Sequence, residues 1–554
     1  MVQLAIVVLV TIALYYELYV GGSVAPQILA DFHVPLTFLI ALSIVANAVG
    51  ALTSLAAGIA DRWGRANFVV IGLFFTGCLV AFGLPHAHTA AEFFPLAAAV
   101  GIVEGMVLVA TPALVRDFSP QLDRASAMGF WTIGPVLGSL VVTGVSSHTL
   151  PSHPRWQYQY ELCGTVGLIV FVIALFWLRE LPARIRAQLI VSTEDVALVE
   201  ARASNIDAER ATEHSWRQMM RADIVLPSFA IAVFLLFYYI AVGFFVIYFA
   251  TNFGYSSARA NALASWYWAT NALALIIGGR LSDRLRVRKP FMLIGALISA
   301  TGVALFAVTT AGVGYYTFAV ILIVIGAGGG VAYCAWMAAF TETVERHNPA
   351  TMATGLGICG STIRIVVTAS LIGFMFAVPA ASTLVDHGAR VKTLAARYST
   401  ELRTAADVEP ATLRTLTARP SDPAAGLAAV RQLMAKEDIT PAVAVSRLQA
   451  LGRVPKADFA YLHRWGAPVQ KAAAVGPGQW RTWWWVCFAG QIAFLPFIWL
   501  LTGRWSPRQA REDARIHLLA TMREQTSVPV VTPSPGRRRT PEILRRLSRK
   551  VVDT

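Results

Sequence analysis

Twelve long apolar stretches, separated by short polar segments, dominate this chain of 554 residues. Most reach the roughly 20 residues that a helix needs to cross the hydrocarbon core of a bilayer. Because lipid offers no hydrogen-bond partner, a spanning backbone must be helical. With 56% hydrophobic and 14% charged residues, the composition also excludes an ordinary soluble protein. We therefore expect an all-α integral membrane protein with spans near 3–28, 37–60, 67–85, 92–115, 126–147, 161–179, 224–250, 260–281, 290–311, 315–340, 352–379 and 482–502.

Two short charged hairpins suggest that the chain is duplicated. Each hairpin lies between two apolar stretches, and the second follows the first at an offset of 222 positions. The same offset relates residues in the apolar stretches themselves, which indicates an internal repeat rather than one chance match. The related pairs are Asp61 and Asp283, Arg62 and Arg284, Tyr16 and Tyr238, and Gly21 and Gly243.

Both hairpins resemble the loop G-x-x-x-D-R-x-G-R-[RK] that is typical of the major facilitator superfamily. The first copy has Asp61, Arg62, Gly64 and Arg65, with Ala57 at the leading glycine position. The second copy has Gly279, Asp283 and Arg284, with Arg286 at the position of the later glycine. The resemblance implies the fold of that family, with twelve transmembrane helices in two pseudo-symmetric six-helix bundles. It also implies that these residues form a conformational latch on the cytoplasmic side; the alternative is an ordinary basic hairpin.

The distribution of Lys and Arg predicts the orientation in the membrane. Placing the loops after helices 2, 4, 8 and 10 inside collects ten basic residues, whereas the opposite short loops contain Arg155 and Arg259. Both termini are then cytoplasmic. Frequent Ala, Arg and Pro suggest a bacterium with GC-rich DNA, so we expect a multi-pass protein of the bacterial inner (plasma) membrane. The first apolar stretch is interpreted as a retained helix rather than a signal peptide.

The segment 380–480 lies between the eleventh and twelfth apolar stretches. Short helices are expected within it, separated by prolines at 410, 420, 423 and 441. Ordinary family members lack this insertion, which resembles those of actinobacterial members. It would cap the entrance, bind an envelope partner or have no transport role.

The whole chain is expected to have six parts. They are 1–180, an N-terminal six-helix bundle; 181–223, a cytoplasmic connector; 224–379, helices 7–11; 380–480, an extracytoplasmic helical insertion; 481–502, helix 12; and 503–554, a basic cytoplasmic tail.

Two carboxylates within the apolar stretches are candidates for proton coupling. Glu17 lies in the first stretch and Glu104 in the fourth, where a charge is costly unless it faces a cavity, a partner or is protonated. The nine-residue step from Glu17 to Pro26 resembles the first-helix motif of proton-driven multidrug antiporters, and also that of aromatic-acid proton symporters. The Arg of helix 4 in drug antiporters is replaced here by Gly101. For either acid the alternative is a structural hydrogen bond.

Arg364 lies near the middle of the eleventh apolar stretch and needs an anion at that depth. It would bind either an acidic substrate, as organic-anion carriers of this family suggest, or one of the carboxylates Glu104 and Glu17. Polar and aromatic side chains on helices 1, 7 and 8 are further candidates for substrate binding, although helix packing and interfacial belts use the same residue types. These candidates are Tyr16, Tyr238, Tyr239, Trp266 and Asn271.

The sequence therefore predicts a secondary active transporter for a small molecule, working by alternating access. Proton-coupled efflux of an amphipathic or lipophilic compound is slightly favoured over proton-coupled symport of an organic anion. A non-transporting sensor or scaffold that displays 380–480 is the alternative from another class. No pattern indicates an enzyme, a cofactor or a metal site, and the five cysteines lack metal-binding spacing. The tail, with twelve basic and five acidic residues, is expected to contact anionic lipid headgroups rather than nucleic acid.

Overall fold

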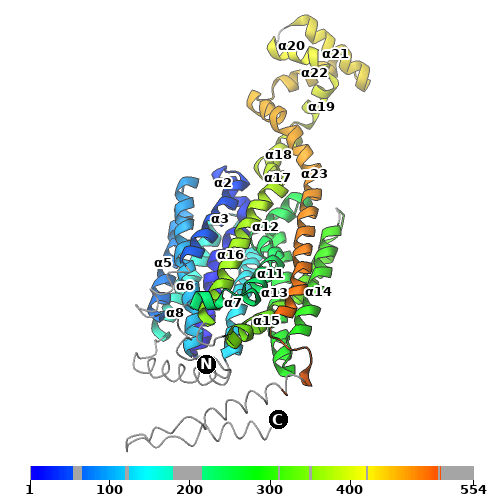
Figure 1. Ribbon diagram of the computed structural model, residues 1–554. Coiled ribbons are helices and arrows are strands. Elements are labelled where there is room, and N and C mark those ends of the chain that lie inside the picture. Colours follow the sequence, from blue (N-terminus) through cyan, green and yellow to red (C-terminus); the bar gives the residue numbers. More distant parts are fainter. Residues whose placement is uncertain are drawn as a thin grey trace, which may run out of the picture.

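The computed structural model describes residues 2–53, 65–118, 124–178, 215–309, 312–347, 352–419, 422–508 and 512. Within these ranges every regular element is helical, and most helices lie side by side in one tall bundle (Figure 1). The start of α1 and residues 501–508 lie at one end of the bundle, which we call the termini side, and residues 379–480 project from the other end, which we call the insertion side (Figure 1). The expected all-α fold is confirmed.

The first half of the bundle comes from the chain before residue 179. Its core is formed by buried aliphatic and aromatic residues of neighbouring helices, as in other helix bundles. Its elements are α1 (Val2–Ser23), α2 (Ala25–Phe32), α3 (Leu36–Thr53), α5 (Arg65–Cys78), η2 (Leu79–Gly83), η3 (Leu84–His86), α6 (Ala90–Phe118), α7 (Arg124–Thr149) and α8 (Trp156–Trp177).

The second half follows the connector, of which residues 179–214 lie outside the described ranges. A large aromatic cluster fills its core on the insertion side, and a second apolar cluster lies nearer the termini side. Its elements are α10 (Ser215–Met219), α11 (Ala222–Phe234), α12 (Leu236–Phe253), α13 (Ser257–Leu285), α14 (Lys289–Val308), α15 (Tyr315–His347), α16 (Met352–Ala377), α23 (Lys456–Phe494) and η8 (Leu495–Leu500).

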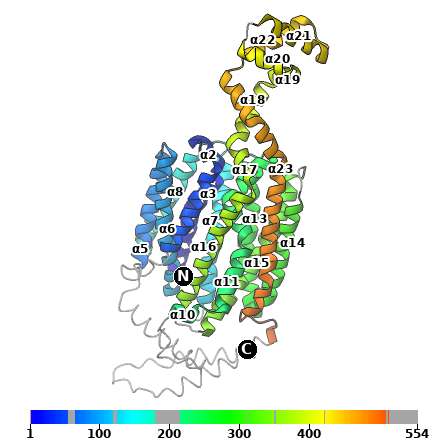
Figure 2. The same ribbon diagram turned by 45° about the horizontal axis from the view of Figure 1, so that its top comes forward.

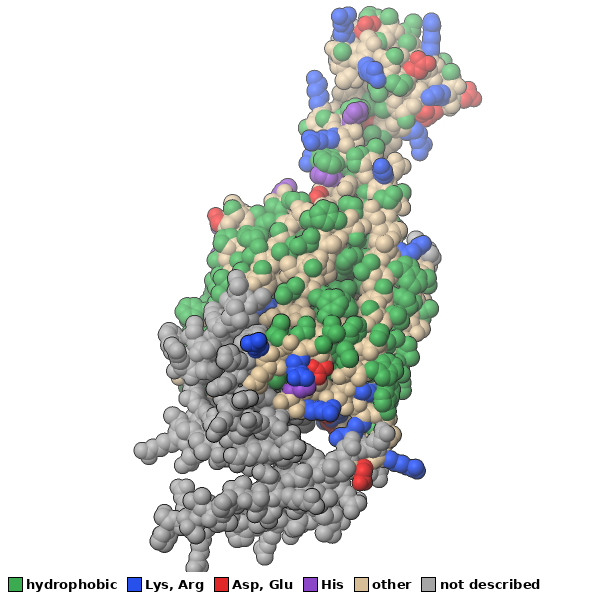
Figure 3. All heavy atoms as spheres, viewed as in Figure 1, with side chains coloured by type: hydrophobic (Ala, Val, Ile, Leu, Met, Phe, Trp, Pro, Cys, Tyr) green, Lys and Arg blue, Asp and Glu red, His purple; other side chains and the backbone are tan. Residues whose placement is uncertain are grey.

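The surface of the bundle agrees with a protein that crosses a membrane several times. Hydrophobic side chains cover its middle, whereas Lys, Arg, Asp and Glu gather at the two ends (Figure 3). Eight described helices are long and apolar enough to span, or nine if the bent pair α2 and α3 forms one span. Helices α6, α7 and α13, of 29, 26 and 29 residues, occupy the other expected spans.

Two expected helices are broken. The first was expected over 3–28 but ends at Ser23, because Val24 leaves the helical region with φ −121° and ψ 16°. Helix α2 then begins at Ala25, with Pro26 in its first turn, and is bent by 116° relative to α3. The seventh helix is interrupted at Leu235, with φ −81° and ψ 4°, between α11 and α12.

The insertion continues the twelfth helix instead of joining it through a loop (Figure 2). Helix α23 begins at Lys456 and runs for 39 residues to Phe494, so the expected start of this helix at 481 is wrong. The prolines within it, Pro468 and Pro477, do not end it. The remaining insertion elements are α17 (Pro379–Thr383), η7 (Leu384–Gly388), α18 (Ala389–Arg397), α19 (Ser399–Asp407), α20 (Pro410–Ala418), α21 (Pro423–Glu437) and α22 (Pro441–Gly452).

The most extensive contacts between the two halves are made by three helix pairs. Helix α7 contacts α13, α3 contacts α16, and α1 contacts α12. Each pair joins one helix from the first half to one from the second. This interface passes through the centre of the bundle, where a carrier would bind its substrate.

Candidate functional site

Arg364 lies on α16 at the interface between the halves. Its guanidinium group packs against Gly50 of α3, where an added methyl group would lie 3.3 Å from Nη1. The missing side chain at Gly50 therefore makes room for the cation. Nη1 is buried, and within the described chain it has no hydrogen-bond partner. A buried donor of a charged group without a partner is costly, so this atom is suited to donate a hydrogen bond to an incoming anion.

Tyrosines from both halves surround this cation. Arg364 interacts electrostatically with Tyr15 and Tyr19 of α1 and with Tyr239 of α12. Tyr19 and Tyr238 are hydrogen bonded to each other, which links α1 to α12. The rings of Tyr15 and Tyr19 lie 5.3 Å apart, as do those of Tyr238 and Tyr239. We call Tyr15, Tyr19, Tyr238, Tyr239 and the neighbouring Tyr333 the tyrosine cluster.

Glu17 faces away from this cluster. It is 3% exposed and packs against α8, where a methyl group added to Gly167 would lie 1.9 Å from its Oε1. Neither carboxyl oxygen has a hydrogen-bond partner among the described residues. The predicted pairing of Glu17 with Arg364 is therefore wrong, because Glu17 points toward α8 and Arg364 points toward α3. The side chain of Glu104 on α6 lies outside the described set, so its pairing with Arg364 stays a prediction.

Three predicted substrate contacts lie elsewhere. Tyr16 is 2% exposed and belongs to the core of the first half, beside Tyr160 and Cys163. Trp266 is 43% exposed and shares an outer face of α13 with exposed leucine and isoleucine side chains, as expected at a lipid contact. Asn271 is buried between α13 and α15, close to Gly329. These positions correct the predicted grouping, whereas Tyr238 and Tyr239 do lie at the interface.

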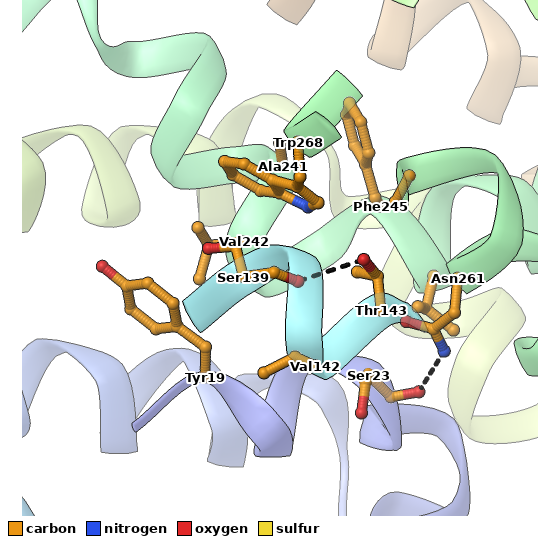
Figure 4. A pocket seen from close by; sticks show the side chains of 13 residues that line it. Tyr19, Ser23, Ser139, Val142, Thr143, Ala241, Val242, Phe245, Asn261 and Trp268 are labelled. Carbon is orange, nitrogen blue, oxygen red and sulfur yellow. Dashed lines mark hydrogen bonds between the residues drawn. The ribbon is translucent and has the colours of Figure 1, made fainter. Parts of the chain in front are cut away.

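A small cavity adjoins the tyrosine cluster on its insertion side (Figure 4). In this conformation it is narrow, with room for about one ordered water molecule. Helices α1, α7, α12 and α13 all contribute to its wall. Tyr19 lines it from α1, and Trp268, whose ring lies 5.1 Å from that of Tyr238, lines it from α13.

Hydrogen bonds connect the two halves around this cavity and above it. Figure 4 shows the bond from Asn261 Nδ2 to the carbonyl oxygen of Ser23, at 3.0 Å. All of the connected residues lie toward the insertion-side ends of their helices, so the halves are closed against each other there. The other bonds run from Ser265 Oγ to Thr143 Oγ1 at 3.0 Å, from Ser257 Oγ to Gln27 Oε1 at 3.2 Å, and from the Leu36 N–H to Asp386 Oδ1 at 2.9 Å.

The second charged hairpin forms an ion-pair network on the termini side. Arg288, rather than Arg284, binds Asp283 at 2.6 Å, and it also binds Glu342 at the end of α15 at 3.1 Å. Burial lowers the pKa of Arg288, but the charges of Glu342 and Asp283 raise it, and the net direction is upward. This network fixes the end of α13 to α15, whereas Arg284 is exposed.

The glycine positions of the hairpins have different outcomes. Gly278 packs tightly against α15, whereas a methyl group added to the predicted Gly279 would lie 4.0 Å from its nearest neighbour, Cys334 Sγ. Of the first hairpin, Asp61, Arg62 and Gly64 lie outside the described residues, as does the side chain of Arg65, which begins α5. Its role as a latch therefore stays a prediction.

Sequence reasoning missed several residues of the site. Tyr15 and Tyr19 are four residues apart and thus share one face of α1, which differs from the face of Glu17. This spacing was the available signal for them. No comparable signal marked Tyr333 or Glu342, because each contributes through contacts with helices distant in sequence.

The fold and site together define a multi-pass membrane protein of two contacting helical halves, with a cation and tyrosines on their interface. This is the arrangement of a membrane carrier. The family model of the Major Facilitator Superfamily matches residues 7–354, more than half of the chain. The chain belongs to this family of membrane transporters.

Solved structures of sugar–proton symporters show the same fold at low sequence identity. A D-xylose–proton symporter is 15% identical with a TM-score of 0.50, covering 67% of this chain and 89% of that chain. The proton–xylose symporter XylE bound to 6-bromo-6-deoxy-D-glucose is 16% identical with a TM-score of 0.52, covering 68% and 88%. A bacterial homologue of the human lysosomal transporter Spinster, inward-facing and unoccupied, is 17% identical with a TM-score of 0.48, covering 91% and 98%. A search of curated proteins found no match.

Proposed function

We propose that this protein is a proton-coupled secondary transporter that binds an amphipathic organic anion at Arg364. The observation that supports this substrate class is the buried Nη1 of Arg364, which lacks a protein partner among the described residues. An anion at this position would form a charge-assisted hydrogen bond in a low-dielectric environment, where such bonds are strong. A neutral ligand would leave the cation unpaired.

The tyrosine cluster supports an amphipathic substrate. Its rings supply apolar and π contact area, and its hydroxyl groups supply hydrogen bonds, so one site serves both ends of such a molecule. Because α1 and α12 both contribute, a ligand held between Tyr19 and Tyr238 would contact both halves. A substrate that touches both halves can bias their relative position, as alternating access requires.

Glu17 is the proposed proton-carrying group. Burying an ionised carboxylate without a hydrogen bond costs roughly several kcal/mol of free energy, whereas burying the neutral acid costs much less. In the conformation described, the protein therefore accommodates the protonated acid better. A second conformation that hydrates Glu17 would release the proton. Glu104 remains a second candidate on the strength of its place in α6.

The proposed orientation places the insertion side outside the cell and both termini in the cytoplasm of a bacterial inner membrane. The basic loops on the termini side support it. The closed contacts near Ser23 and Asn261 then make this conformation closed to the outside. We further propose that the basic tail contacts anionic headgroups and that 380–480 binds an envelope protein.

Export of a neutral or cationic lipophilic compound is the second candidate. The first-helix motif around Glu17 and the aromatic walls beside Trp268 favour it. The D-xylose–proton symporter likeness concerns the fold alone and does not choose between the two. The sensor alternative predicts ligand binding without transport.

A binding experiment separates transport of an organic anion from export of a neutral or cationic compound. Purified protein would be titrated with aromatic carboxylates, organophosphates, lipophilic cations and neutral dyes, with thermal stabilisation as the readout. We expect an anion to bind, and Arg364→Gln to weaken its binding by roughly 10- to 100-fold, the range for a charged hydrogen bond. Arg364→Lys should retain part of the affinity, and Arg481→Gln, an exposed arginine of α23, should retain all of it. Selective binding of cations, unaffected by Arg364→Gln, would contradict the proposal.

A further inference from the structure

The first residues of the insertion, α17 and η7, are called its root. This root contacts the opposite half of the transporter. Asp386 lies in η7, just after α16 and α17 of the second half. Its Oδ1 accepts a hydrogen bond from the backbone N–H of Leu36, the first residue of α3 in the first half, at 2.9 Å. Its Oδ2 accepts a second bond from Ser382 at 3.0 Å, which fixes the carboxylate in this direction.

The bond to Leu36 has the chemistry of a helix N-cap supplied by another part of the chain. The first N–H groups of a helix have no partner within it, and the N-terminal end carries a partial positive charge. Leu36 opens α3 directly after Val34 and Pro35, so its own preceding side chains offer no oxygen acceptor. Asp386 therefore satisfies a donor of α3 only while the two halves are together on the insertion side.

The root itself is held to the second half. Gln479 of α23 accepts a bond from the Ala380 N–H at 2.9 Å. The His387 ring stacks on Trp465 with centroids 3.5 Å apart, and Nδ1 is hydrogen bonded to the Tyr461 hydroxyl at 3.0 Å. Burial lowers the pKa of His387, against a smaller opposite effect of Asp386, which favours the neutral ring for stacking. These contacts make Asp386 move with α23 and not with α3.

From this geometry we infer that Asp386 is a gating residue, through which the insertion holds the transporter closed on the insertion side. The inference rests on the alternating access of the proposed function, because the bond must break whenever the halves separate there. Unlike the bonds of Asn261, Ser265 and Ser257, it comes from the insertion. Any force or partner that displaces the root would thus change the population of the closed conformation.

The test measures the separation of the halves without any substrate. Spin labels would be attached at Ser152→Cys, on the hairpin after α7, and Tyr316→Cys, at the start of α15; both positions are exposed on the insertion side. Double electron–electron resonance then gives the distribution of distances between them. Protein without the two introduced cysteines would report labelling of the native thiols, all of which are buried or half-buried.

Asp386→Ala should raise the ratio of long to short distances by roughly fivefold, the size of effect that loss of a helix N-cap produces. Asp386→Asn, which retains an acceptor oxygen, should stay near wild type. Asp422→Ala is the matched control, because Asp422 caps α21 within the insertion and its cap bonds go to Ala424 and Ala425. The inference fails if Asp386→Ala leaves the distances unchanged, or if Asp422→Ala shifts them equally.

This outcome is independent of the substrate. Should the anion proposal fail while Asp386→Ala still opens the insertion side, the gate stands and only the substrate class is wrong. Should anions bind through Arg364 while the distances of Asp386→Ala equal those of wild type, the site stands and the gate is wrong.

Discussion

Arg286 ends helix α13 in the left-handed region, with φ of 55°. It occupies the position where the related loop has a glycine, which adopts this conformation without a steric penalty. For a residue with a Cβ atom the same conformation costs roughly 1 kcal/mol. The hairpin therefore places a residue with a Cβ atom in a conformation that favours glycine.

Replacing this residue tests that interpretation. Arg286→Gly should raise the free energy of unfolding by about 0.5–1 kcal/mol, because the strain at φ 55° is relieved. Thermal denaturation in detergent would detect the gain. Arg286→Ala removes the same charge but keeps the Cβ atom, so it should give no comparable gain. Equal stabilisation by both variants would attribute the effect to charge.

At the residue scale, the sequence located single charges better than it located their partners. Arg364 and Glu17 were identified because a charge within an apolar stretch is conspicuous. Tyr16 was grouped with Tyr238 through the repeat offset, yet rotation of α1 places Tyr15 and Tyr19 at the interface instead. An offset of whole helices does not determine which face of each helix meets the other half.

At the element scale, the close approach of α1 and α12 depends on Gly22. A methyl group added there would lie 2.2 Å from the carbonyl oxygen of Val242, well inside van der Waals contact. Helix backbones in membranes approach this closely only at small residues. This contact closes the insertion side near the bond between Ser23 and Asn261.

Gly22→Ala should therefore disfavour the closed conformation. Ser265 lies half-buried where α13 meets α7, between the same two halves. Alkylation of Ser265→Cys by a water-soluble maleimide should become several-fold faster, because the separation of α1 and α12 moves the halves apart. Gly243→Ala is the matched control, since an added methyl group at Gly243 meets nothing within 4 Å. An unchanged rate in Gly22→Ala would show that the helices adjust without opening.

The sequence predicted where helices occur more reliably than where they end. Prolines 410, 423 and 441 begin α20, α21 and α22, as expected for a residue suited to the first helical turn. Pro468 and Pro477 lie inside α23 without ending it, and this part of the chain packs against α17, η7 and α18. The break at Leu235 has no local signal, since leucine is a good helix former.

At the scale of the whole molecule, the transporter consists of two halves joined at the insertion side and an insertion continuous with α23 (Figure 1). The repeat offset predicted the two halves, and the family match supports that assignment. The contact between the insertion root and α3 could not be predicted, because Asp386 and Leu36 are 350 residues apart. It depends on the packed position of every helix between them.

Proton movement in reconstituted vesicles tests the central claim most directly. Proteoliposomes with an imposed pH gradient would be given an anion that binds the purified protein, and the internal pH would be followed. We predict an anion-dependent proton flux that Glu17→Gln abolishes and that Glu161→Gln, at an exposed glutamate of α8, leaves intact. Transport of the anion with no proton movement, or a flux that persists in Glu17→Gln, would contradict proton coupling through Glu17.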